Sequence, residues 1–323
     1  MKILFIESPD LLYPWYDDFL EAIGGRHEVI LYEYGRPVEE QFRDIDIVVD
    51  RGGRGTHAMI DAAFESGVKL WQVIGTGLDH LDVRYIQQKG IPVANTPGLF
   101  SGIALAEHAL FLMLCLAKNL STALNNIRAG TFAKPINDEL EGKTLGLVGF
   151  GASARALAQR AWPLGMRILA IDTVPVPQNI LEGLHVEFFG GPQQLDQLLA
   201  EADYVSVHVP LTSETRNMID QRALRLMKPT ACLINVARGA IVDEPALIEA
   251  LQGGWIKGAG LDTFAHEPLP LSSPLLHMEN VITTPHIAGV TWGTSKRRGR
   301  AAAENVDRVA QGLPPLYQAA SVE

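Results

Sequence analysis

The 323-residue sequence is poor in cysteine, which excludes a disulfide-stapled secreted scaffold. Only Cys115 and Cys232 occur, the first in an apolar helix-like run and the second in an apolar strand-like run. We interpret both as buried free thiols in a reducing compartment and expect a cytoplasmic protein. A reactive thiol is the less favoured alternative. No Cys/His cluster has zinc-ligand spacing, so we expect no metal.

Positive charge and long hydrophobic runs are also scarce. There are 27 Lys and Arg against 37 Asp and Glu, a net charge of −10, which argues against nucleic acid or an anionic membrane as partner. The longest apolar stretch, Ile103–Ala117, is too short to span a bilayer and contains Glu107 and His108, so we expect a buried helix. The segment Met1–Glu7 is typical of a strand rather than a signal peptide.

Short apolar segments alternate with helical patterns, a rhythm typical of parallel, doubly wound sheets. In the first part of the chain we expect helices near Trp15–Ile23, Thr56–Ser66 and Val83–Gln88. The strands expected there are Lys2–Ile6, Glu28–Tyr32, Asp46–Val49, Lys69–Ile74 and Pro92–Asn95.

A long helix near Ser101–Lys118 interrupts this rhythm and connects to a second βα series. Its expected strands are Lys143–Val148, Arg167–Ile171, Val186–Phe188, Tyr204–His208, Cys232–Val236, Lys257–Leu261 and Val281–Thr283. Its expected helices are Ala152–Leu164, Leu195–Glu201, Gln221–Leu226 and Glu244–Leu251, the last capped by Asp243. A final helix near Val290–Gln311 is expected to return to the first domain.

The predicted fold class is therefore α/β, with two doubly wound parallel-sheet (Rossmann-like) domains and a cleft between them. We expect residues 1–99 plus 290–323 to form a flavodoxin-like substrate (catalytic) domain. Residues 100–289 are expected to form a NAD-binding Rossmann domain. Two crossings between the domains would make the cleft a hinged one that holds the substrate.

A glycine-rich turn between a strand and a helix predicts the dinucleotide site. Gly149 allows the tight turn, Gly151 lets a pyrophosphate approach the backbone, and Ala154 allows close helix–strand packing. The following helix would direct its free N–H groups at the phosphates. A tight turn without a ligand is the less favoured alternative.

Asp172 ends the next strand, at the distance expected for the acid that accepts hydrogen bonds from the adenosine ribose. A carboxylate there would repel the 2′-phosphate of NADP, and no Lys or Arg occurs between Arg167 and Arg216 to neutralise it. We therefore predict NAD as the cofactor.

At this point the sequence resembles the D-isomer-specific 2-hydroxyacid dehydrogenases, which include glyoxylate/hydroxypyruvate reductases and D-phosphoglycerate dehydrogenase. The resemblance covers nearly the whole chain, and the last three of its motifs are highly specific in their order and spacing. The motifs are Val73–Asp79, Asn95–Gly98, Ala106–His108, the glycine turn, His208–Thr212, Ile234–Gly239, Leu261–Phe264 with Glu267-Pro268, and Thr284–Gly289. The chain departs from the family pattern at Ala152, where a larger polar residue is common, and at Phe100 before Ser101.

The resemblance implies three catalytic residues, Arg238, Glu267 and His286. His286 suits proton transfer because imidazole titrates near neutral pH, and it would be the general acid in reduction and the base in oxidation. Glu267 would orient its ring and favour the imidazolium. Arg238 would grip the substrate carboxylate and polarise the carbonyl, and Gly239 would leave room for the substrate.

The resemblance also implies the binding residues. The substrate is expected to contact Arg238, His286 and the loop Ile74, Gly75, Thr76 and Gly77, whose backbone N–H groups form an anion nest. Asp262 is expected to accept from the nicotinamide carboxamide, and His208 to pack beside the adenosine. The full set of expected cofactor contacts is Gly149, Gly151, Ala152, Ser153, Asp172, His208, Pro210, Thr215, Val236, Ala237, Asp262 and Gly289.

The resemblance further implies a homodimer formed through the cofactor domain. Arg51 or Arg54 would contact a substrate anion, with a solvated loop charge as the alternative. Tyr13, Trp15 and Trp292 would line the cleft or pack in the core; aromatic walls would favour larger 2-oxo acids over glyoxylate.

The leading interpretation is a NAD-dependent oxidoreductase that transfers a hydride between NAD(H) and a D-2-hydroxy acid/2-oxo acid pair. A NAD-sensing, corepressor-like scaffold of the same fold is the alternative, and a nucleotide-binding protein without turnover is a third. Glu267 in place of Gln argues against formate as substrate, whereas phosphite stays open.

Overall fold

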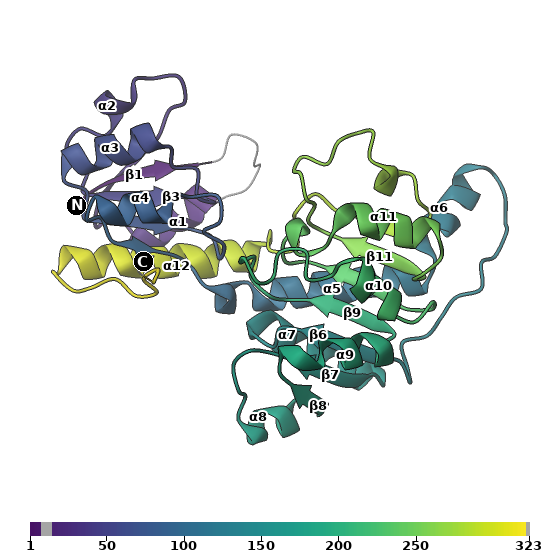
Figure 1. Cartoon of the computed structure of the whole chain (residues 1–323). Helices are drawn as coiled ribbons and strands as arrows, with labels where there is room; N and C mark the ends of the chain where they lie inside the picture. Colours follow the sequence, from purple (N-terminus) through teal and green to yellow (C-terminus); the bar gives the residue numbers. More distant parts are fainter. Residues whose placement is uncertain (8–14, 321–323) are drawn as a thin grey trace. The chain divides into compact units, whose positions relative to one another are not determined.

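The computed structural model describes residues 1–7 and 15–320, and Tyr13 lies outside these residues. The chain divides into two compact units, Met1–Phe100 with Val290–Glu323 and Ser101–Gly289 (Figure 1). The division falls one residue from the expected boundary. Each unit contains a parallel sheet with helices, which confirms the prediction of two α/β domains.

The first unit contains a five-stranded sheet in the order β2-β1-β3-β4-β5. All four strand pairs are parallel. The order reverses between β1 and β3, so the carboxyl ends of these strands flank the topological switch point of a flavodoxin-like sheet. The strand bounds are β1 Lys2–Ile6, β2 Glu28–Leu31, β3 Ile47–Asp50, β4 Leu70–Val73 and β5 Val93–Ala94.

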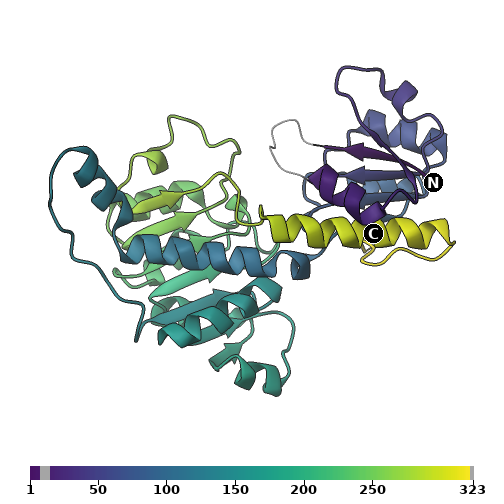
Figure 2. The ribbon, with the colours of Figure 1, turned by 180° about the vertical axis from the view of Figure 1, so that it is seen from behind.

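Helices cover both faces of this sheet, as Figures 1 and 2 show. On one face lie α1 (Trp15–Ile23) and α12 (Trp292–Ala310), so the last long helix packs with the first one. Gly299 allows this, because a Cβ there would lie 3.2 Å from the Asp18 carbonyl carbon. The other face carries α2 (Val38–Gln41), α3 (His57–Ser66) and α4 (Val83–Gln88).

The second unit contains a seven-stranded sheet in the order β12-β11-β10-β9-β6-β7-β8, with every pair parallel. The five inner strands of this sheet are buried almost throughout, as expected for a sheet covered on both faces. They are β11, β10, β9, β6 and β7. The chain reverses direction across the sheet between β6 and β9, which places a switch point at their carboxyl ends. The strand bounds are β6 Thr144–Val148, β7 Arg167–Ile171, β8 Val186–Gly190, β9 Tyr204–Val207, β10 Cys232–Asn235, β11 Gly258–Leu261 and β12 Val281–Thr283.

Two helices, α5 (Gly102–Ala117) and α7 (Ala152–Ala161), cover one face of this sheet, α5 running across the front in Figure 2. Gly102 makes their close packing possible, since a Cβ there would lie 3.0 Å from the Ala152 carbonyl carbon. The remaining helices of the unit are α6 Leu120–Arg128, α8 Gln178–Gly183, α9 Leu195–Glu201, α10 Gln221–Leu226 and α11 Glu244–Gln252, and α9 to α11 cover the opposite face.

The helix predicted over Ala152–Leu164 is shorter than expected. Its α-helical part ends at Ala161, and Trp162–Leu164 form a 3-10 turn. Pro163 lacks the N–H that would continue the helix, and Gly165 takes a left-handed conformation with φ of 78°. Three short helices, α2, α6 and α8, were not predicted.

No single helix among residues 1–7 and 15–320 is long and apolar enough to cross a bilayer. The helices α5 and α6 meet that length and composition only as a pair bent by 59°. In the structure α5 packs on strands β10, β11 and β12, which confirms the buried helix expected for Ile103–Ala117.

Candidate active site

The two turn glycines after β6 differ in the space around them. Gly149 has φ of 89°, and a Cβ there would lie 2.8 Å from Val209 Cγ1 and 3.0 Å from the His208 carbonyl, so the fold itself requires glycine. Gly151 has no atom within 4 Å of an added Cβ. The space beside Gly151 lies where α7 begins without a side-chain cap, so the free N–H groups of its first turn suit a pyrophosphate.

Ser153 and His208 join the first turn of α7 to the end of β9. Ser153 Oγ lies 3.0 Å from His208 Nδ1, and Ser206 Oγ lies 2.9 Å from His208 Nε2. Burial lowers the pKa of His208 to about 4, so its ring is neutral at pH 7. His208 therefore holds the start of α7 and the end of β9 together at the switch point, and it is unsuited to proton donation.

Asp172 connects the end of β7 to the glycine turn. Its Oδ2 accepts from the Phe150 N–H at 2.6 Å, and its Oδ1 accepts from the Val174 N–H at 2.9 Å. Asp172 Oδ1 also accepts from the Thr173 hydroxyl at 3.4 Å, so the second lone pair of Oδ2 is the acceptor that Asp172 retains for a ribose hydroxyl.

The loop after β9 is closed by Thr215. Its hydroxyl donates to the Pro210 carbonyl at 2.7 Å and accepts from the Thr212 N–H at 2.8 Å. Pro210 and Thr215 are thus held as one turn at the carboxyl edge of the sheet.

Arg238 follows β10 and is positioned by a buried asparagine. Asn235 Nδ2 donates to the Arg238 carbonyl at 2.9 Å, and Asn235 Oδ1 accepts from the Ala237 N–H at 3.0 Å. The Arg238 guanidinium donates to the Ala237 carbonyl at 2.8 Å. Val236, the residue between, is buried in the core, so Asn235 and Val236 together fix the start of this loop.

Gly239 is required by the packing of two loops. A Cβ at Gly239 would lie 1.9 Å from the Phe264 carbonyl carbon and 2.4 Å from the Ala265 nitrogen. This close approach of the backbone is sufficient to explain the glycine, and the room expected for a substrate stays a prediction. The contact joins the loop that carries Arg238 to the segment that leads to Glu267.

Glu267 and His286 form a hydrogen-bonded pair, with His286 Nδ1 2.7 Å from Glu267 Oε2. The other carboxylate oxygen accepts from the Phe264 N–H at 3.0 Å. Burial alone would raise the pKa of Glu267, but the hydrogen bond and charge of His286, the Phe264 N–H and the charge of Arg238 together lower it. An ionised Glu267 fixes the imidazole and leaves Nε2 for a reaction partner.

Asp262, at the end of β11, is fully buried and holds the His286 loop. Its Oδ1 accepts from Thr284 Oγ1 at 2.6 Å and from the Ile287 N–H at 2.8 Å, and its Oδ2 accepts from the Ala288 N–H at 2.8 Å. Both oxygens therefore serve the chain's own backbone. The loop ends at Gly289, where an added Cβ would make ordinary contact with Leu105, 3.5 Å away.

In the first unit, the loop after β4 turns its carbonyl groups to one side. The Gly75 carbonyl accepts from the Thr96 N–H at 3.1 Å, and the Thr76 carbonyl accepts from Asn95 Nδ2 at 2.8 Å. Ile74 is anchored in the core by its N–H bond to the Asp50 carbonyl at 2.9 Å. Among the described residues, the N–H groups of Gly75, Thr76 and Gly77 donate to no backbone carbonyl, so they are available for the anion nest that is predicted for this loop.

Arg51 is held within the first unit. Its guanidinium lies 4.8 Å from the centre of the buried Trp15 ring, and Nε is 3.8 Å from Glu7 Oε1. Burial lowers the pKa of Arg51 to about 10, so it stays charged at pH 7. The Arg54 N–H donates to the fully buried Asp50 carboxylate at 2.8 Å.

The two tryptophans expected at the cleft differ in exposure. Trp15 is buried and packs in the core of the first unit, whereas Trp292 is 67% exposed at the start of α12.

Each unit thus gathers its own part of the candidate site at the carboxyl edge of its sheet, where ligands bind in open α/β sheets. The second unit contributes the expected cofactor and catalytic residues, and the first contributes Ile74 to Gly77. Sequence reasoning missed the supporting contacts of Asn235 and Thr284. Their positions, three residues before Arg238 and two residues before His286 in two of the motifs, were the available signal.

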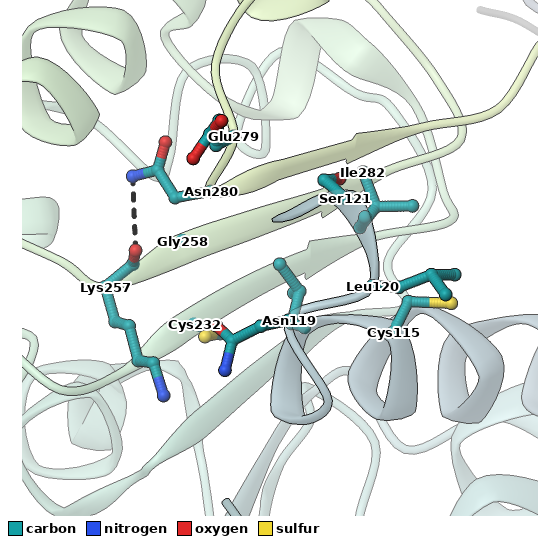
Figure 3. A pocket seen from close by; sticks show the side chains of 11 residues that line it. Cys115, Asn119, Leu120, Ser121, Cys232, Lys257, Gly258, Glu279, Asn280 and Ile282 are labelled. Atoms are coloured by element: carbon teal, nitrogen blue, oxygen red, sulfur yellow. Dashed lines mark hydrogen bonds between the residues drawn. The ribbon is translucent and has the colours of Figure 1, made fainter. Parts of the chain in front are cut away.

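A small cavity of about 30 Å³, the space of about one water, lies at the opposite edge of the second sheet (Figure 3). Cys115 and Cys232 both line it, and both are free and buried, as predicted. Burial raises the pKa of both thiols, that of Cys232 to about 12, so they are protonated and unreactive. None of the expected site residues lines this cavity. Among the described residues, no group of three or more His, Cys, Asp and Glu could hold a metal.

The seven-stranded sheet, its glycine turn and the Arg238, Glu267 and His286 loops define a NAD-dependent dehydrogenase architecture. Residues 110–288 match the family described as D-isomer specific 2-hydroxyacid dehydrogenase, NAD binding domain. The chain belongs to this family, as the sequence motifs had indicated, and NAD is its cofactor.

Individual relatives agree over most of the chain. A glyoxylate reductase of Korarchaeum cryptofilum is 40% identical over 266 residues, covering 79% of this chain and 78% of the relative. A hydroxypyruvate reductase of Thermotoga maritima is 38% identical over 260 residues, covering 79% and 82%. The structure of D-lactate dehydrogenase from Aquifex aeolicus complexed with NAD and lactic acid has a TM-score of 0.80 at 29% identity, covering 96% of both chains.

These similarities favour the enzyme over the scaffold alternative. The chain is a NAD-dependent D-2-hydroxyacid dehydrogenase or 2-oxoacid reductase.

Proposed function

We propose that the chain reduces short 2-oxo acids, of the glyoxylate and hydroxypyruvate class, to the corresponding 2-hydroxy acids with NADH, with the D configuration where the product carbon is chiral. The observation that carries this proposal is the Glu267–His286 pair, 2.7 Å apart, beside the Arg238 loop at the carboxyl edge of a NAD-binding sheet. The names of the relatives support the substrate class.

The three catalytic residues divide the work of ketone reduction. NADH, when bound, supplies the hydride that reaches the carbonyl carbon. His286 delivers a proton from Nε2 to the carbonyl oxygen, and in the reverse direction accepts it from the hydroxyl. Glu267 holds the ring through Nδ1 and favours the imidazolium. Arg238 binds the substrate carboxylate and polarises the carbonyl with its planar set of donors.

The proposed cofactor contacts lie in the loops that follow strands of the second sheet. The open space at Gly151 and the N–H groups of Ala152 and Ser153 would receive the pyrophosphate. Asp172 would accept from the adenosine ribose, and the turn between Pro210 and Thr215 would flank the cofactor. The remaining proposed contacts are Gly149, His208, Val236, Ala237, Asp262 and Gly289. Asp262 has one unused lone pair, on Oδ2, for the nicotinamide carboxamide.

The first unit is the proposed substrate domain, with the N–H groups of Gly75, Thr76 and Gly77 as a second anchor for the carboxylate and Ile74 beside it. Trp15 is buried, so it is not available as one of the three aromatic side chains that were expected to line the cleft and favour larger 2-oxo acids. Its burial therefore agrees with a short substrate.

A panel of 2-oxo acids tests the substrate class. NADH oxidation at neutral pH is measured with glyoxylate, hydroxypyruvate, pyruvate, 2-oxoglutarate, 2-ketoisocaproate and phenylpyruvate, for wild type and Arg238→Lys. We expect kcat/KM to be highest for glyoxylate or hydroxypyruvate. Arg238→Lys should raise KM and lower kcat, because a single ammonium cannot form the two parallel hydrogen bonds. A strong preference for phenylpyruvate would contradict the proposed class.

We also propose a homodimer through the cofactor domain and a cytoplasmic location, the latter supported by the free thiols. The second unit exposes large apolar side chains along α5, α6 and the segment after α6, which we call the apolar arm. Exposed apolar side chains that gather on neighbouring elements are typical of protein–protein interfaces. Its members are Ile103, Phe111, Leu114, Leu124, Ile127, Phe132 and Ile136.

Light scattering after size-exclusion chromatography tests the dimer. Phe132 and Ile136 are 84% and 96% exposed, so the double change to Asp should leave the fold intact and yield monomers. Leu271→Asp is the control, since Leu271 is 88% exposed in the same unit outside the apolar arm. A dimer unchanged in the double variant would contradict this interface.

A further inference from the structure

A partly buried hydrogen-bond chain leads from α5 to the loop that carries His286. His108 Nε2 lies 2.9 Å from Thr284 Oγ1, and Thr284 Oγ1 lies 2.6 Å from Asp262 Oδ1. His108 and Asp262 themselves approach to 3.5 Å. These three residues come from the middle of α5 and the ends of β12 and β11, and all lie in the second unit.

Chemistry fixes the direction of this chain. A carboxylate only accepts, so the Thr284 hydroxyl donates to Asp262. The Thr284 oxygen then accepts from His108, which requires a proton on Nε2. Burial lowers the pKa of His108 although the charge of Asp262 opposes the shift. The Nε2–H tautomer satisfies the geometry, and so does the imidazolium.

The chain ends at a carboxylate that controls the His286 backbone. The Asp262 carbonyl accepts from the His286 N–H at 2.8 Å, and its side chain accepts from the next two N–H groups, those of Ile287 and Ala288. His286 itself has φ of 54°, a left-handed conformation that a non-glycine residue keeps only where its surroundings enforce it.

We propose that His108 is a positioning residue for the reduction, and this rests on the proposed role of His286. By donating to Thr284, His108 orients the hydroxyl toward Asp262 and restricts the carboxylate to one rotamer. That rotamer holds the backbone of His286 to Ala288, and with it the alignment of His286 Nε2 with the substrate oxygen. Proton transfer requires this alignment, whereas cofactor binding does not.

Two pairs of variants test the proposal. Thr284→Val removes the hydroxyl at nearly constant shape, and Thr283→Val is its matched control, because the Thr283 side chain has no hydrogen-bond partner among the described residues. His108→Leu removes the donor, and His108→Gln restores an N–H donor near the Nε2 position. For each we measure kcat, KM, the Kd of NADH and the thermal midpoint.

We expect kcat to fall about 10-fold or more in Thr284→Val and His108→Leu, with the Kd of NADH changed by less than about 2-fold. Thr283→Val should match wild type, and His108→Gln should recover most of kcat. Wild-type kcat in both Thr284→Val and His108→Leu would overturn the proposal. A lowered thermal midpoint with unchanged kcat, or no recovery in His108→Gln, would show a purely structural role and would also overturn it.

A second readout does not depend on turnover. Long-range nitrogen–proton NMR of histidine-labelled protein reports the tautomer of each ring, and the spectrum of His108→Gln assigns the His108 signal. A proton on Nε2 supports the chain, and a neutral ring protonated on Nδ1 contradicts it. If wild type and Thr283→Val consumed no NADH with any 2-oxo acid while the tautomer agreed, the proposed function would fail and the hydrogen-bond chain would stand.

Discussion

His286 Nδ1 and Glu267 Oε2 lie 2.7 Å apart although the residues are 19 positions apart and belong to different loops. Two separate constraints bring them together. The Asp262 carboxylate holds the backbone after His286, and the Phe264 N–H holds the far oxygen of Glu267. The pair is therefore preorganised by residues of the second unit alone.

Glu267→Gln tests the electrostatic half of this relationship. Gln retains an oxygen for the Phe264 N–H but removes the negative charge, so the imidazolium loses its partner. We expect kcat for reduction to fall about 100-fold at neutral pH. Steady-state NADH oxidation measures this effect, and a wild-type kcat would contradict the orienting role.

Two glycines offer a matched comparison between fold and ligand. Gly239→Ala places a Cβ 1.9 Å from the Phe264 carbonyl carbon, so we expect a loss of about 3 kcal/mol or more in the free energy of unfolding. Gly151→Ala meets no atom within 4 Å, so stability should change by less than about 0.5 kcal/mol.

Gly151→Ala is expected to weaken NADH binding although it leaves the stability of the fold unchanged. A methyl group in the space for the pyrophosphate should raise the Kd of NADH by about 10-fold, measured by fluorescence titration. If Gly151→Ala bound NADH as wild type does, the pyrophosphate would have to lie elsewhere.

Asp172→Asn tests the preference for NADH over NADPH. The amide oxygen can keep one backbone bond, to Phe150 or Val174, while the charge that repels a 2′-phosphate is lost. We expect the ratio of kcat/KM with NADH to that with NADPH to fall about 10-fold. Glu187→Gln removes one negative charge from the neighbouring strand β8 and should leave the ratio unchanged. An equal effect of both substitutions would point to general charge rather than a specific contact.

His208 makes stability depend on pH on the acid side of neutrality. Its folded pKa is about 4 against an unfolded value near 6.5, so between these values the unfolded chain binds a proton that the folded chain does not. Stability should therefore fall as the pH drops, by about 2 kcal/mol between pH 7 and pH 5. Urea unfolding of the cofactor-free protein measures this, and His208→Gln should lose most of the dependence. An equal loss in the variant would assign the effect to other groups.

The parts of the fold that could be predicted from sequence are those with a local signal. The buried parallel strands were located to within about one or two residues, because continuous apolar runs between turn residues mark them. Asp243 was identified as a helix cap, and its side chain accepts from the Ala246 N–H at 3.1 Å. By contrast, α6 was not recognised, because its run of apolar residues at helical spacing, Leu120, Leu124 and Ile127, is short and none of these side chains is buried.

The site shows the same distinction. The positions of Arg238, Glu267 and His286 followed from motifs, but the reasons for their neighbours did not. Gly239 is required by Phe264, and His108 meets Thr284 across 176 residues of chain, and no local pattern encodes contacts between segments so far apart. Such contacts depend on the strand order, which places the ends of β10, β11 and β12 side by side.

His286 is proposed to transfer the proton when the 2-oxo acid is reduced. The most direct test of this role is steady-state NADH oxidation with glyoxylate and hydroxypyruvate by wild type and His286→Gln, with the Kd of NADH measured for both. We expect turnover by wild type and a loss of about 1,000-fold or more in kcat for the variant, with NADH bound within about 3-fold of wild type. Wild-type turnover by His286→Gln would contradict it.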